Sequence, residues 1–322
     1  MNTIVPIASG KGGVGKSILT ASLGSALAAA GKTVILMDLD LGSGNLHTCL
    51  GIKNRYAGIG SIVYKKEKHL NSIIVETEIP RLFFIPGDTL LPGTANLQYF
   101  TKKKILKEMK SLVADYVLLD LGAGNNYNVV DFYLNSSSGL VITTPETTAI
   151  LNAYSFLKTA LYRLLYRSFP PRSDERKIIR NFASQRIEQS ETNFSNLISQ
   201  IGSHNAESGQ TAEAQKKRFI NRIILNMGTN AQDLKIGSRL REIARRNLDV
   251  EIEYLGFLHK SDIPSESIIQ RKPAYYIDAA STYRKEIDKI AGKLIHAPVP
   301  TPPELYESNE DLEEIQEEMQ NM

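Results

Sequence analysis

One short stretch of the sequence combines glycines, lysines and a hydroxyl at a spacing that suits phosphate chemistry. The stretch runs from Gly10 to Ser17 and reads Gly-Lys-Gly-Gly-Val-Gly-Lys-Ser. In such a loop the glycines turn backbone N–H groups towards a phosphate, a lysine such as Lys16 meets the β- and γ-phosphates, and the hydroxyl of Ser17 contacts Mg²⁺. An apolar run at 4–8 precedes the motif and a run rich in Ala and Leu follows it. This strand, loop and helix context predicts a nucleotide-binding site.

Carboxylates stand at the ends of two apolar runs that the sequence predicts to be buried strands. Asp38 and Asp40 follow the run at 33–37, and Asp120 follows the run at 116–119. Because chemistry gathers at the carboxyl ends of parallel strands, we expect these side chains to face the nucleotide. Asp120 has the pattern of a residue that holds Mg²⁺ through water. Asp38 and Asp40 could instead cap the turn that follows them.

The phosphate loop also contains Lys11, a second lysine that an ordinary loop of this kind does not need. With this residue the motif resembles the deviant phosphate loop of the MinD/ParA family of ATPases. The resemblance implies that Lys11 reaches across a dimer interface to the partner's nucleotide, much as an arginine finger does. A solvated loop lysine is the alternative.

The same resemblance implies roles for residues beyond the loop. The residues from Asp38 to Asn45 resemble the family's first switch. In it, Asp40 would position or activate the attacking water, Asp38 would lie near the Mg²⁺ shell, and Asn45 would sense the γ-phosphate. Gly122 would let a backbone N–H approach the γ-phosphate in a second switch, although Leu121 replaces the small hydroxyl residue common there. The motif and the resemblance together predict a catalytic set of Lys11, Lys16 and Asp40, and a metal-binding set of Ser17, Asp38 and Asp120.

The resemblance further implies which residues bind the nucleotide and which nucleotide it is. The family places an asparagine on adenine where Asn226 follows the apolar run at 219–225. The residues after Asn226 do not form a guanine signature, so ATP is favoured over GTP. The predicted nucleotide-binding residues are Gly10, Lys11, Gly12, Gly13, Val14, Gly15, Lys16, Ser17, Ile18, Asn45, Gly122 and Asn226.

Composition limits the class of protein. A chain of 322 residues that is 42% hydrophobic can bury a large core. Its net charge of +3 and pI of about 8.7 do not require a nucleic-acid partner. The single cysteine, Cys49, excludes an internal disulfide and a Cys-x-x-Cys metal site, which favours a reduced, cytoplasmic protein. No apolar run approaches about 18 residues and no leader precedes the first strand, so we expect neither a membrane span nor secretion.

The predicted fold is α/β, a P-loop NTPase with a doubly wound, mostly parallel sheet flanked by helices. We expect residues 1–297 to form the ATPase domain, with a polar insertion at about 168–218 after a long helix at 147–166. The insertion is expected to be a solvated helical hairpin with a flexible loop at 202–211, and a partner or nucleic-acid surface is the alternative. Basic residues mark its early half: Arg163, Arg167, Arg172, Arg176, Lys177 and Arg180. The lysines of a predicted helix at 94–113 are also expected to be exposed: Lys102, Lys103 and Lys104.

Residues 298–322 form a proline-rich spacer and an acidic tail. Leu312, Ile315 and Met319 follow a narrow helical spacing among acidic residues, which differs from a basic amphipathic membrane helix, and anionic lipid should repel such a segment. Our hypothesis is a helix that docks on a basic protein groove, for which the insertion is one candidate, with disorder as an equal alternative.

The resemblance implies a nucleotide-dependent spatial or regulatory switch of the flagellar or cell-division placement type. ATP and Mg²⁺ would close a homodimer that presents a surface to an unidentified protein partner, and slow, partner-stimulated hydrolysis would reopen it. The alternative is a ParA-like partition ATPase that binds non-specific DNA through a basic helix around 235–246. A cluster-carrier ATPase is disfavoured because Cys49 alone cannot supply paired thiolates.

Overall fold

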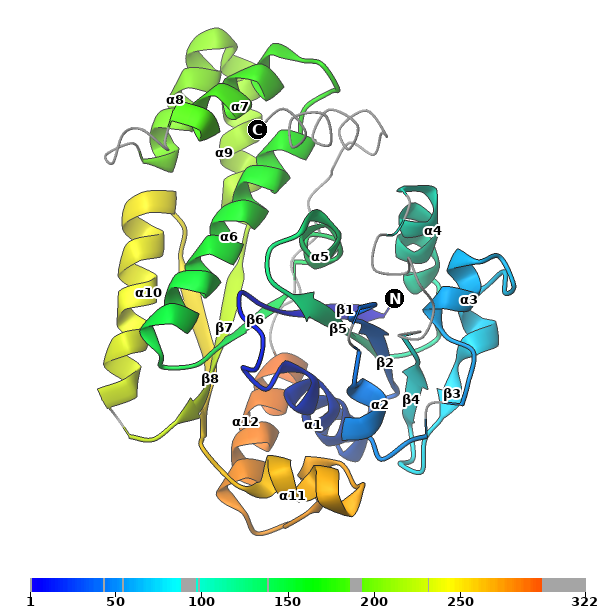
Figure 1. Cartoon of the computed structure of the whole chain (residues 1–322). Helices are drawn as coiled ribbons and strands as arrows, with labels where there is room; N and C mark the ends of the chain where they lie inside the picture. Colours follow the sequence, from blue (N-terminus) through cyan, green and yellow to red (C-terminus); the bar gives the residue numbers. More distant parts are fainter. Residues whose placement is uncertain are drawn as a thin grey trace.

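An eight-stranded sheet forms the centre of the described part of the chain (Figure 1), and its strand order is β3-β4-β2-β5-β1-β6-β7-β8. The structure is a computed structural model that describes residues 2–42, 44–53, 55–87, 97, 99–137, 139–185, 193–230 and 232–296. Neighbouring strands are parallel except at the β3–β4 edge, which is antiparallel. The strands are β1 Thr3–Ser9, β2 Val34–Leu39, β3 Val75–Glu76, β4 Leu82–Ile85, β5 Tyr116–Ala123, β6 Leu140–Thr143, β7 Asn221–Gly228 and β8 Ile252–His259.

Helices cover both faces of the sheet, so the predicted doubly wound α/β fold is confirmed (Figure 1). Side chains of β1 alternate between the two cores, since Val5 and Ile7 pack with α1 and α12 whereas Ile4 and Ala8 pack with α5 and α6. A strand that is covered on both faces is apolar at every position, which explains why the sequence shows continuous apolar runs and no polar alternation. The helices of the first part of the chain are α1 Lys16–Ala29, α2 Leu46–Cys49, α3 Ile59–Val63, η1 Leu70–Ile73, α4 Tyr99–Met109, α5 Tyr127–Tyr133 and α6 Thr147–Arg167.

The described residues of the insertion form three helices and not the expected hairpin. They are α7 Asp174–Gln185, α8 Phe194–His204 and α9 Ala206–Arg218, and they lie together at the far end of α6 (Figure 1). The flexible loop predicted at 202–211 was wrong, because α8 and α9 meet there with Asn205 between them. A Cβ atom on Gly209 would come within 2.6 Å of the Cα atom of Gly202. The two glycines that indicated a loop therefore allow two helices to pack closely.

A buried cluster of charges lies where the sequence predicted solvated lysines and arginines. Asp131 of α5 accepts hydrogen bonds from Nε of Arg163 and Nη1 of Arg167, each at 2.9 Å, and it is also paired with Lys102 of α4. We call these four residues the Asp131 cluster. Their exposed fractions are 5% or less, so the expected exposure of Lys102 and of the two arginines was wrong. Burial alone would raise the pKa of Asp131, but the charges of Arg163, Lys102 and Arg167 hold the pKa well below its usual range.

The last helices complete both layers, because α10 packs against α6 on one face of the sheet and α12 packs against α1 on the other. They are α10 Gln232–Leu248, α11 Ile263–Gln270, η2 Ala274–Tyr276 and α12 Thr282–His296. Within the described residues, no helix is both long enough and apolar enough to traverse a bilayer. The proline-rich spacer and the acidic tail at 298–322 lie outside the described residues.

Candidate nucleotide-binding site

The loop between β1 and α1 has the shape that phosphate binding requires. Gly13 and Gly15 have φ angles of +81° and +82°, which side chains with a Cβ atom rarely adopt. A Cβ atom on Gly10 would lie 2.1 Å from the carbonyl oxygen of Asn152, so α6 passes directly behind the loop. Because α1 begins at Lys16, with Ser17 and Ile18 in its first turn, the backbone N–H groups at its start remain available to an anion.

Asn226 supports the loop from the side of β7. Its Nδ2 atom donates a hydrogen bond of 2.8 Å to the carbonyl oxygen of Val14, and a Cβ atom on Gly15 would lie 2.5 Å from the same Nδ2 atom. The structure thus brings Asn226 to the phosphate loop, where it fixes the backbone. The contact with adenine that the resemblance implies for Asn226 stays a prediction.

The carboxylates of β2 and β5 lie side by side at the carboxyl edge of the sheet. Asp38 is paired in register with Asp120, and Ile7 of β1 flanks Asp120 on its other side. Oδ1 of Asp120 lies 2.6 Å from Nζ of Lys16, and both side chains are buried. Within the described residues, Oδ2 of Asp120 is also buried but has no hydrogen-bond partner. An orphaned carboxylate oxygen at the start of α1 fits a site for a divalent cation, which prefers oxygen ligands.

Asp38 is held by the segment that the resemblance assigns to the first switch. It accepts hydrogen bonds from the backbone N–H groups of Asp40, at 3.1 Å, and Leu46, at 3.3 Å. Burial raises the pKa of Asp38 to about 8, and the nearby charge of Asp120 adds to the shift. A Cβ atom on Gly44 would lie 2.5 Å from both carboxylate oxygens, so only glycine fits there. A cation bound beside Asp38 would therefore favour the ionised form of its carboxyl group.

The two predicted switch segments meet beside these carboxylates. Asp40 follows the end of β2, and a Cβ atom on Gly122 would lie 3.5 Å from Oδ1 of Asp40. Asn45 is the residue that precedes α2. The structure therefore brings together Asp40 and Gly122, which lie far apart in the sequence, at the edge that also holds Lys16.

Lys11 contacts its own chain in this structure. Its Nζ atom lies 2.9 Å from Oε2 of Glu146 and 3.5 Å from Oγ1 of Thr148, at the start of α6. The side chains of Lys11 and Glu146 are 40% and 63% exposed, so solvent screens the ion pair and it is easily broken. Sequence reasoning did not find Glu146 or Thr148, because nothing in the local pattern links them to a loop 135 residues earlier.

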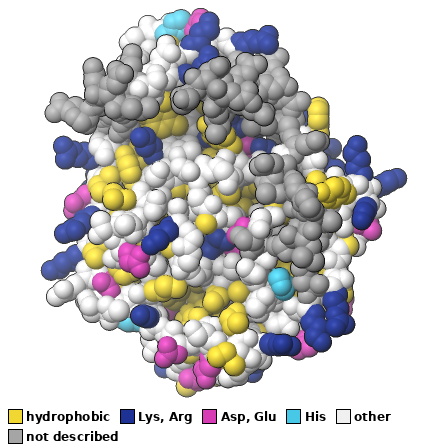
Figure 2. All heavy atoms as spheres, viewed as in Figure 1, with side chains coloured by type: hydrophobic (Ala, Val, Ile, Leu, Met, Phe, Trp, Pro, Cys, Tyr) yellow, Lys and Arg dark blue, Asp and Glu magenta, His cyan; other side chains and the backbone are white. Residues whose placement is uncertain are grey.

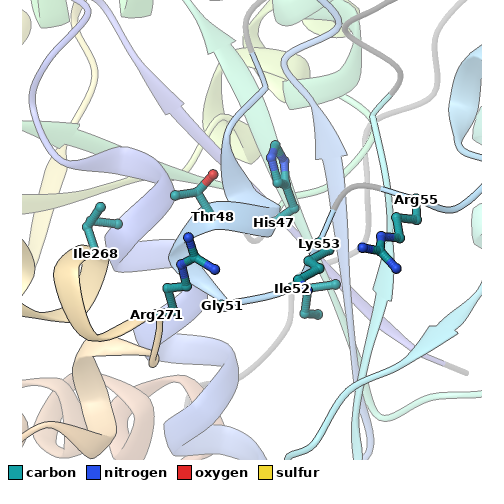
Figure 3. A pocket seen from close by; sticks show the side chains of 8 residues that line it. All are labelled: His47, Thr48, Gly51, Ile52, Lys53, Arg55, Ile268 and Arg271. Carbon is teal, nitrogen blue, oxygen red and sulfur yellow. The ribbon is translucent and has the colours of Figure 1, made fainter.

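A separate cavity of about 500 Å³ lies beside α2 (Figure 3). Its walls come from α2, the turn after α2, and α11, and it does not include the phosphate loop. The lining residues are His47, Thr48, Gly51, Ile52, Lys53, Arg55, Ile268 and Arg271. Three of these side chains are cationic, and burial lowers the pKa of His47. Sequence reasoning missed this cavity because its two walls come from distant segments.

Cys49 lies on the inner side of α2. The side chain is buried, and burial raises the pKa of its thiol to about 12, with a further contribution from the charges of Asp120 and Asp38. The thiol is therefore an apolar packing group beside the site.

The family model of the CobQ/CobB/MinD/ParA nucleotide-binding domain matches residues 5–274. This chain therefore belongs to that family, as the phosphate loop and the two carboxylate-ended strands predicted.

Two relatives match this chain over different shares of its length. The flagellum site-determining protein YlxH of Helicobacter pylori is 27% identical over 299 residues, which are 90% of this chain and 81% of YlxH. The septum site-determining protein MinD of Synechocystis is 34% identical over 160 residues, which are 48% of this chain and 57% of that protein. These relatives support the prediction of a MinD/ParA-type protein and not the DNA-binding alternative.

A solved structure of MinD from Pyrococcus horikoshii, in complex with Mg-ADP, has the same fold. The TM-score is 0.61 at 19% identity, and the match covers 92% of this chain and 97% of that chain. The predicted P-loop NTPase fold is thereby confirmed.

Proposed function

We propose that this chain binds ATP with Mg²⁺ at the phosphate loop. The observation that carries the proposal is the Lys16–Asp120 ion pair, in which two buried charges meet at the start of α1 beside Asp38. Phosphate oxygens would replace Asp120 as the partner of Lys16, and Ser17, Asp38 and Asp120 would hold Mg²⁺. The bound cation would neutralise charge on the phosphates. The Mg-ADP of the Pyrococcus relative supports this choice of ligand.

The same site hydrolyses ATP slowly. Asp40 orients the attacking water, because its carboxylate lies beside Gly122 at the edge where the γ-phosphate would reach the second switch. Phosphoryl transfer depends mainly on positioning and charge stabilisation, and the chain supplies cations for this through Lys16 and Lys11. A low basal rate follows because Lys11 of a single chain contacts Glu146 of its own chain and has no partner's nucleotide to reach.

ATP closes a homodimer by drawing Lys11 away from Glu146. The exposed ion pair between Lys11 and Glu146 contributes little, whereas the phosphates of the partner's nucleotide carry several negative charges. Lys11 exchanges the carboxylate of Glu146 for phosphates that bind it more strongly, and dimerisation therefore depends on ATP. The dimer then presents a surface to a protein partner, and hydrolysis restores the single chain.

We infer a cellular role in positioning, of the kind named for the relatives. One relative is called a flagellum site-determining protein and several are called septum site-determining proteins, and an Aquifex aeolicus structure holds MinD together with MinC. These names support a nucleotide-dependent placement protein with a protein partner. The partner itself can be captured with ATP-loaded protein.

The experiment that tests this function is sedimentation of the full chain with ATP, ADP or GTP, each with Mg²⁺. We expect a dimer with ATP alone, together with slow release of phosphate. A protein that stays monomeric with ATP, or that dimerises equally with GTP, contradicts the proposal. The non-hydrolysing variant Asp40→Ala, loaded with ATP, then serves as bait for the partner.

DNA binding is the less favoured function, because arginines of the basic helix α10 are engaged within the domain. Arg245 forms a two-bonded ion pair with Glu251, and Nε of Arg241 donates to the carbonyl oxygen of Ile252. ATP-dependent, salt-sensitive binding to DNA of random sequence would favour this function instead.

A further inference from the structure

The cavity beside α2 gathers positive charge that has no partner in the fold. Three of its lining residues are the cations Lys53, Arg55 and Arg271, and the described lining residues include no Asp or Glu. All three side chains are exposed, and within the described part of the chain none of them forms an ion pair or a side-chain hydrogen bond. By contrast, the exposed Arg245 is held by two hydrogen bonds to Glu251. The cavity therefore presents three cations that are available to an anion.

Backbone contacts between two helix ends hold the cavity in shape. Gly51, which follows α2, has a φ angle of +70°, and Arg271, which follows α11, has a φ angle of +52°. A Cβ atom on Gly51 would lie 2.0 Å from the carbonyl oxygen of Arg271, so only glycine lets the two turns meet. The N–H of Ile52 donates to the carbonyl oxygen of His47 at 2.9 Å, which fixes the turn after α2. Figure 3 shows Arg271 rising from the end of α11 towards Thr48 of α2. The walls are thus formed before any ligand binds.

The size and lining of the cavity suit a small organic molecule. Its volume of about 500 Å³ lies within the range of small-molecule pockets, roughly 300–1,000 Å³. Ile52 and Ile268 give the walls an apolar part against which a carbon skeleton can pack. Figure 2 shows Lys and Arg side chains gathered at the lower right of this face, around where Figure 1 places α2 and β3, so the surrounding surface attracts anions.

The three cations favour phosphate as the anionic group. Arginine binds phosphate through two parallel hydrogen bonds, and lysine adds a compact charge. A phosphate group carries about −1.5 to −2 charges at pH 7, whereas a carboxylate carries one, so two phosphate groups balance three cations within a small volume.

We propose that the cavity beside α2 binds a small organic molecule that carries two phosphate groups. Lys53, Arg55 and Arg271 contact the phosphates, and Ile52 and Ile268 face the rest of the molecule. This site is separate from the phosphate loop, because no residue of that loop lines it.

The two sites share one short helix. The N–H of Leu46, the first residue of α2, donates to Oδ2 of Asp38 at 3.3 Å, and the next two residues, His47 and Thr48, line the cavity. A ligand in the cavity therefore rests on the helix that also holds Asp38.

Methyl NMR of the full chain tests the proposal, with inorganic pyrophosphate as the probe. Isoleucine methyl groups are labelled with ¹³C and assigned with Ile→Val variants, Mg-ADP is added first, and pyrophosphate is then titrated at constant ionic strength. We expect the signals of Ile52 and Ile268 to shift saturably while that of Ile18, beside the phosphate loop, stays fixed. Fixed signals of Ile52 and Ile268, or equal shifts with citrate, overturn the proposal. The response of Ile18 to Mg-ADP reports on the phosphate loop separately, so failure there is a different result.

A lipid headgroup could supply the same phosphate chemistry, and vesicles that contain phosphatidic acid distinguish the two sources. A free ligand predicts that these vesicles leave the signals of Ile52 and Ile268 unchanged. Loss of both signals on adding vesicles would assign the cavity to a headgroup and overturn the proposal.

A charge variant shows whether the cations carry the binding. Replacement of Lys53, Arg55 and Arg271 by Gln should weaken pyrophosphate binding at least about tenfold, because glutamine lacks the charge for these hydrogen bonds. The matched control replaces one lysine and two arginines that are exposed on α10 and do not line the cavity: Lys235, Arg239 and Arg246. It should change the affinity by less than about twofold, because salt screens distant charges. Equal weakening in both variants would show attraction to net charge alone and refute the site.

Cations near helix ends can also stabilise the helices themselves. Chemical denaturation of the two variants separates this role from binding. If the cavity variant loses stability while the wild type shows no methyl shift with pyrophosphate, the three cations serve only the ends of α2 and α11, and the proposal is wrong.

Discussion

Lys16 and Asp120 form a buried ion pair at the start of α1, so each side chain neutralises the charge of the other in the protein without nucleotide. Lys16 has two functions in this arrangement. It neutralises a carboxylate that has no exposed surface, and it is the cation proposed for the β- and γ-phosphates. A single substitution should therefore affect both stability and ligand binding, and the two effects can be separated.

We predict that Lys16→Ala abolishes ATP binding and lowers the free energy of unfolding by about 3–5 kcal/mol, because it leaves Asp120 buried and unpaired. Calorimetry with ATP and chemical denaturation measure the two effects. Adding Asp120→Asn should restore part of the stability but none of the binding. Lys66→Ala, at an exposed lysine after α3, is the control. Unchanged ATP affinity in Lys16→Ala would refute the site.

Asp40→Ala should separate binding from hydrolysis. The carboxylate is proposed to orient water, so its loss should reduce the hydrolysis rate by about a hundredfold, in the lower range for a positioned catalytic group. ATP affinity should change little, because Asp40 is not in the metal-binding set. Single-turnover phosphate release and calorimetry provide the two measurements. Hydrolysis at the wild-type rate would eliminate this role for Asp40.

Lys11→Ala and Glu146→Gln form a matched pair, since the two residues form one ion pair. Lys11→Ala should bind ATP but remain monomeric, because its proposed target is the partner's phosphate. Glu146→Gln should keep ATP-dependent dimerisation, because it frees the lysine. Sedimentation with Mg-ATP distinguishes them. Normal dimerisation of Lys11→Ala would show that this lysine does not act across the interface.

The sequence predicted the chemistry of the loop because glycine, lysine and serine occur there at a fixed spacing on a short segment. It also placed Asp38 and Asp120 at strand ends, and the register confirms that they are neighbours. Glu146 escaped prediction because its link to Lys11 depends on how α6 approaches the loop. Such an approach is a property of tertiary packing and leaves no local pattern.

At the scale of elements, the Asp131 cluster shows why a run of lysines was misread. The pattern at 102–104 does not reveal that α5 places a carboxylate against one of the three lysines. Lys102 is buried while Lys103 is exposed, because adjacent residues of a helix point in different directions. Three arginines that were expected to be solvated are buried for the same reason: Arg163 and Arg167 of α6 and Arg176 of α7.

We predict that Asp131→Asn lowers the free energy of unfolding at pH 7 by about 3–5 kcal/mol, because it leaves buried cations without their shared carboxylate. The pKa of Asp131 lies well below its usual range in the folded protein, so its contribution is fully present at neutral pH. It fades as the pH falls below the unfolded value of about 4, through the still lower folded pKa. Denaturation at pH 7 and at lower pH should therefore show a shrinking difference between the two proteins.

The control for this prediction is Asp174→Asn, which removes an exposed partner of Lys177. It should leave the denaturation midpoint unchanged, because solvent screens that pair. Adding Lys102→Met to Asp131→Asn should recover part of the lost stability, because it removes one uncompensated cation. Equal stability of Asp131→Asn and the wild type would show that the cluster is not electrostatically coupled.

At the scale of the whole molecule, the order of strands and helices followed from the sequence because each apolar run ends in a turn signal or a carboxylate. The three-helix insertion and the cationic cavity beside α2 did not follow. Both depend on contacts between segments that are distant in the sequence and that have no periodicity in common.

Binding to lipid vesicles is a property that must be measured on the full chain. We predict that the full chain with Mg-ATP does not sediment with anionic vesicles through residues 304–322, because that acidic segment is repelled by anionic lipid. The matched comparison is the variant in which Glu310, Glu313, Glu314 and Glu317 are replaced by Gln. Binding that depends on the wild-type tail would contradict the prediction, and binding that is independent of the tail would implicate the basic helices.

Cys49 gives the protein a practical property. Its thiol is buried and, with a pKa of about 12, is almost entirely protonated at neutral pH, so it reacts slowly with maleimides. It is also the only cysteine in the sequence. A cysteine introduced on the surface would therefore be the one rapidly labelled position, and fluorophores or spin labels can be attached to the native background without first replacing Cys49.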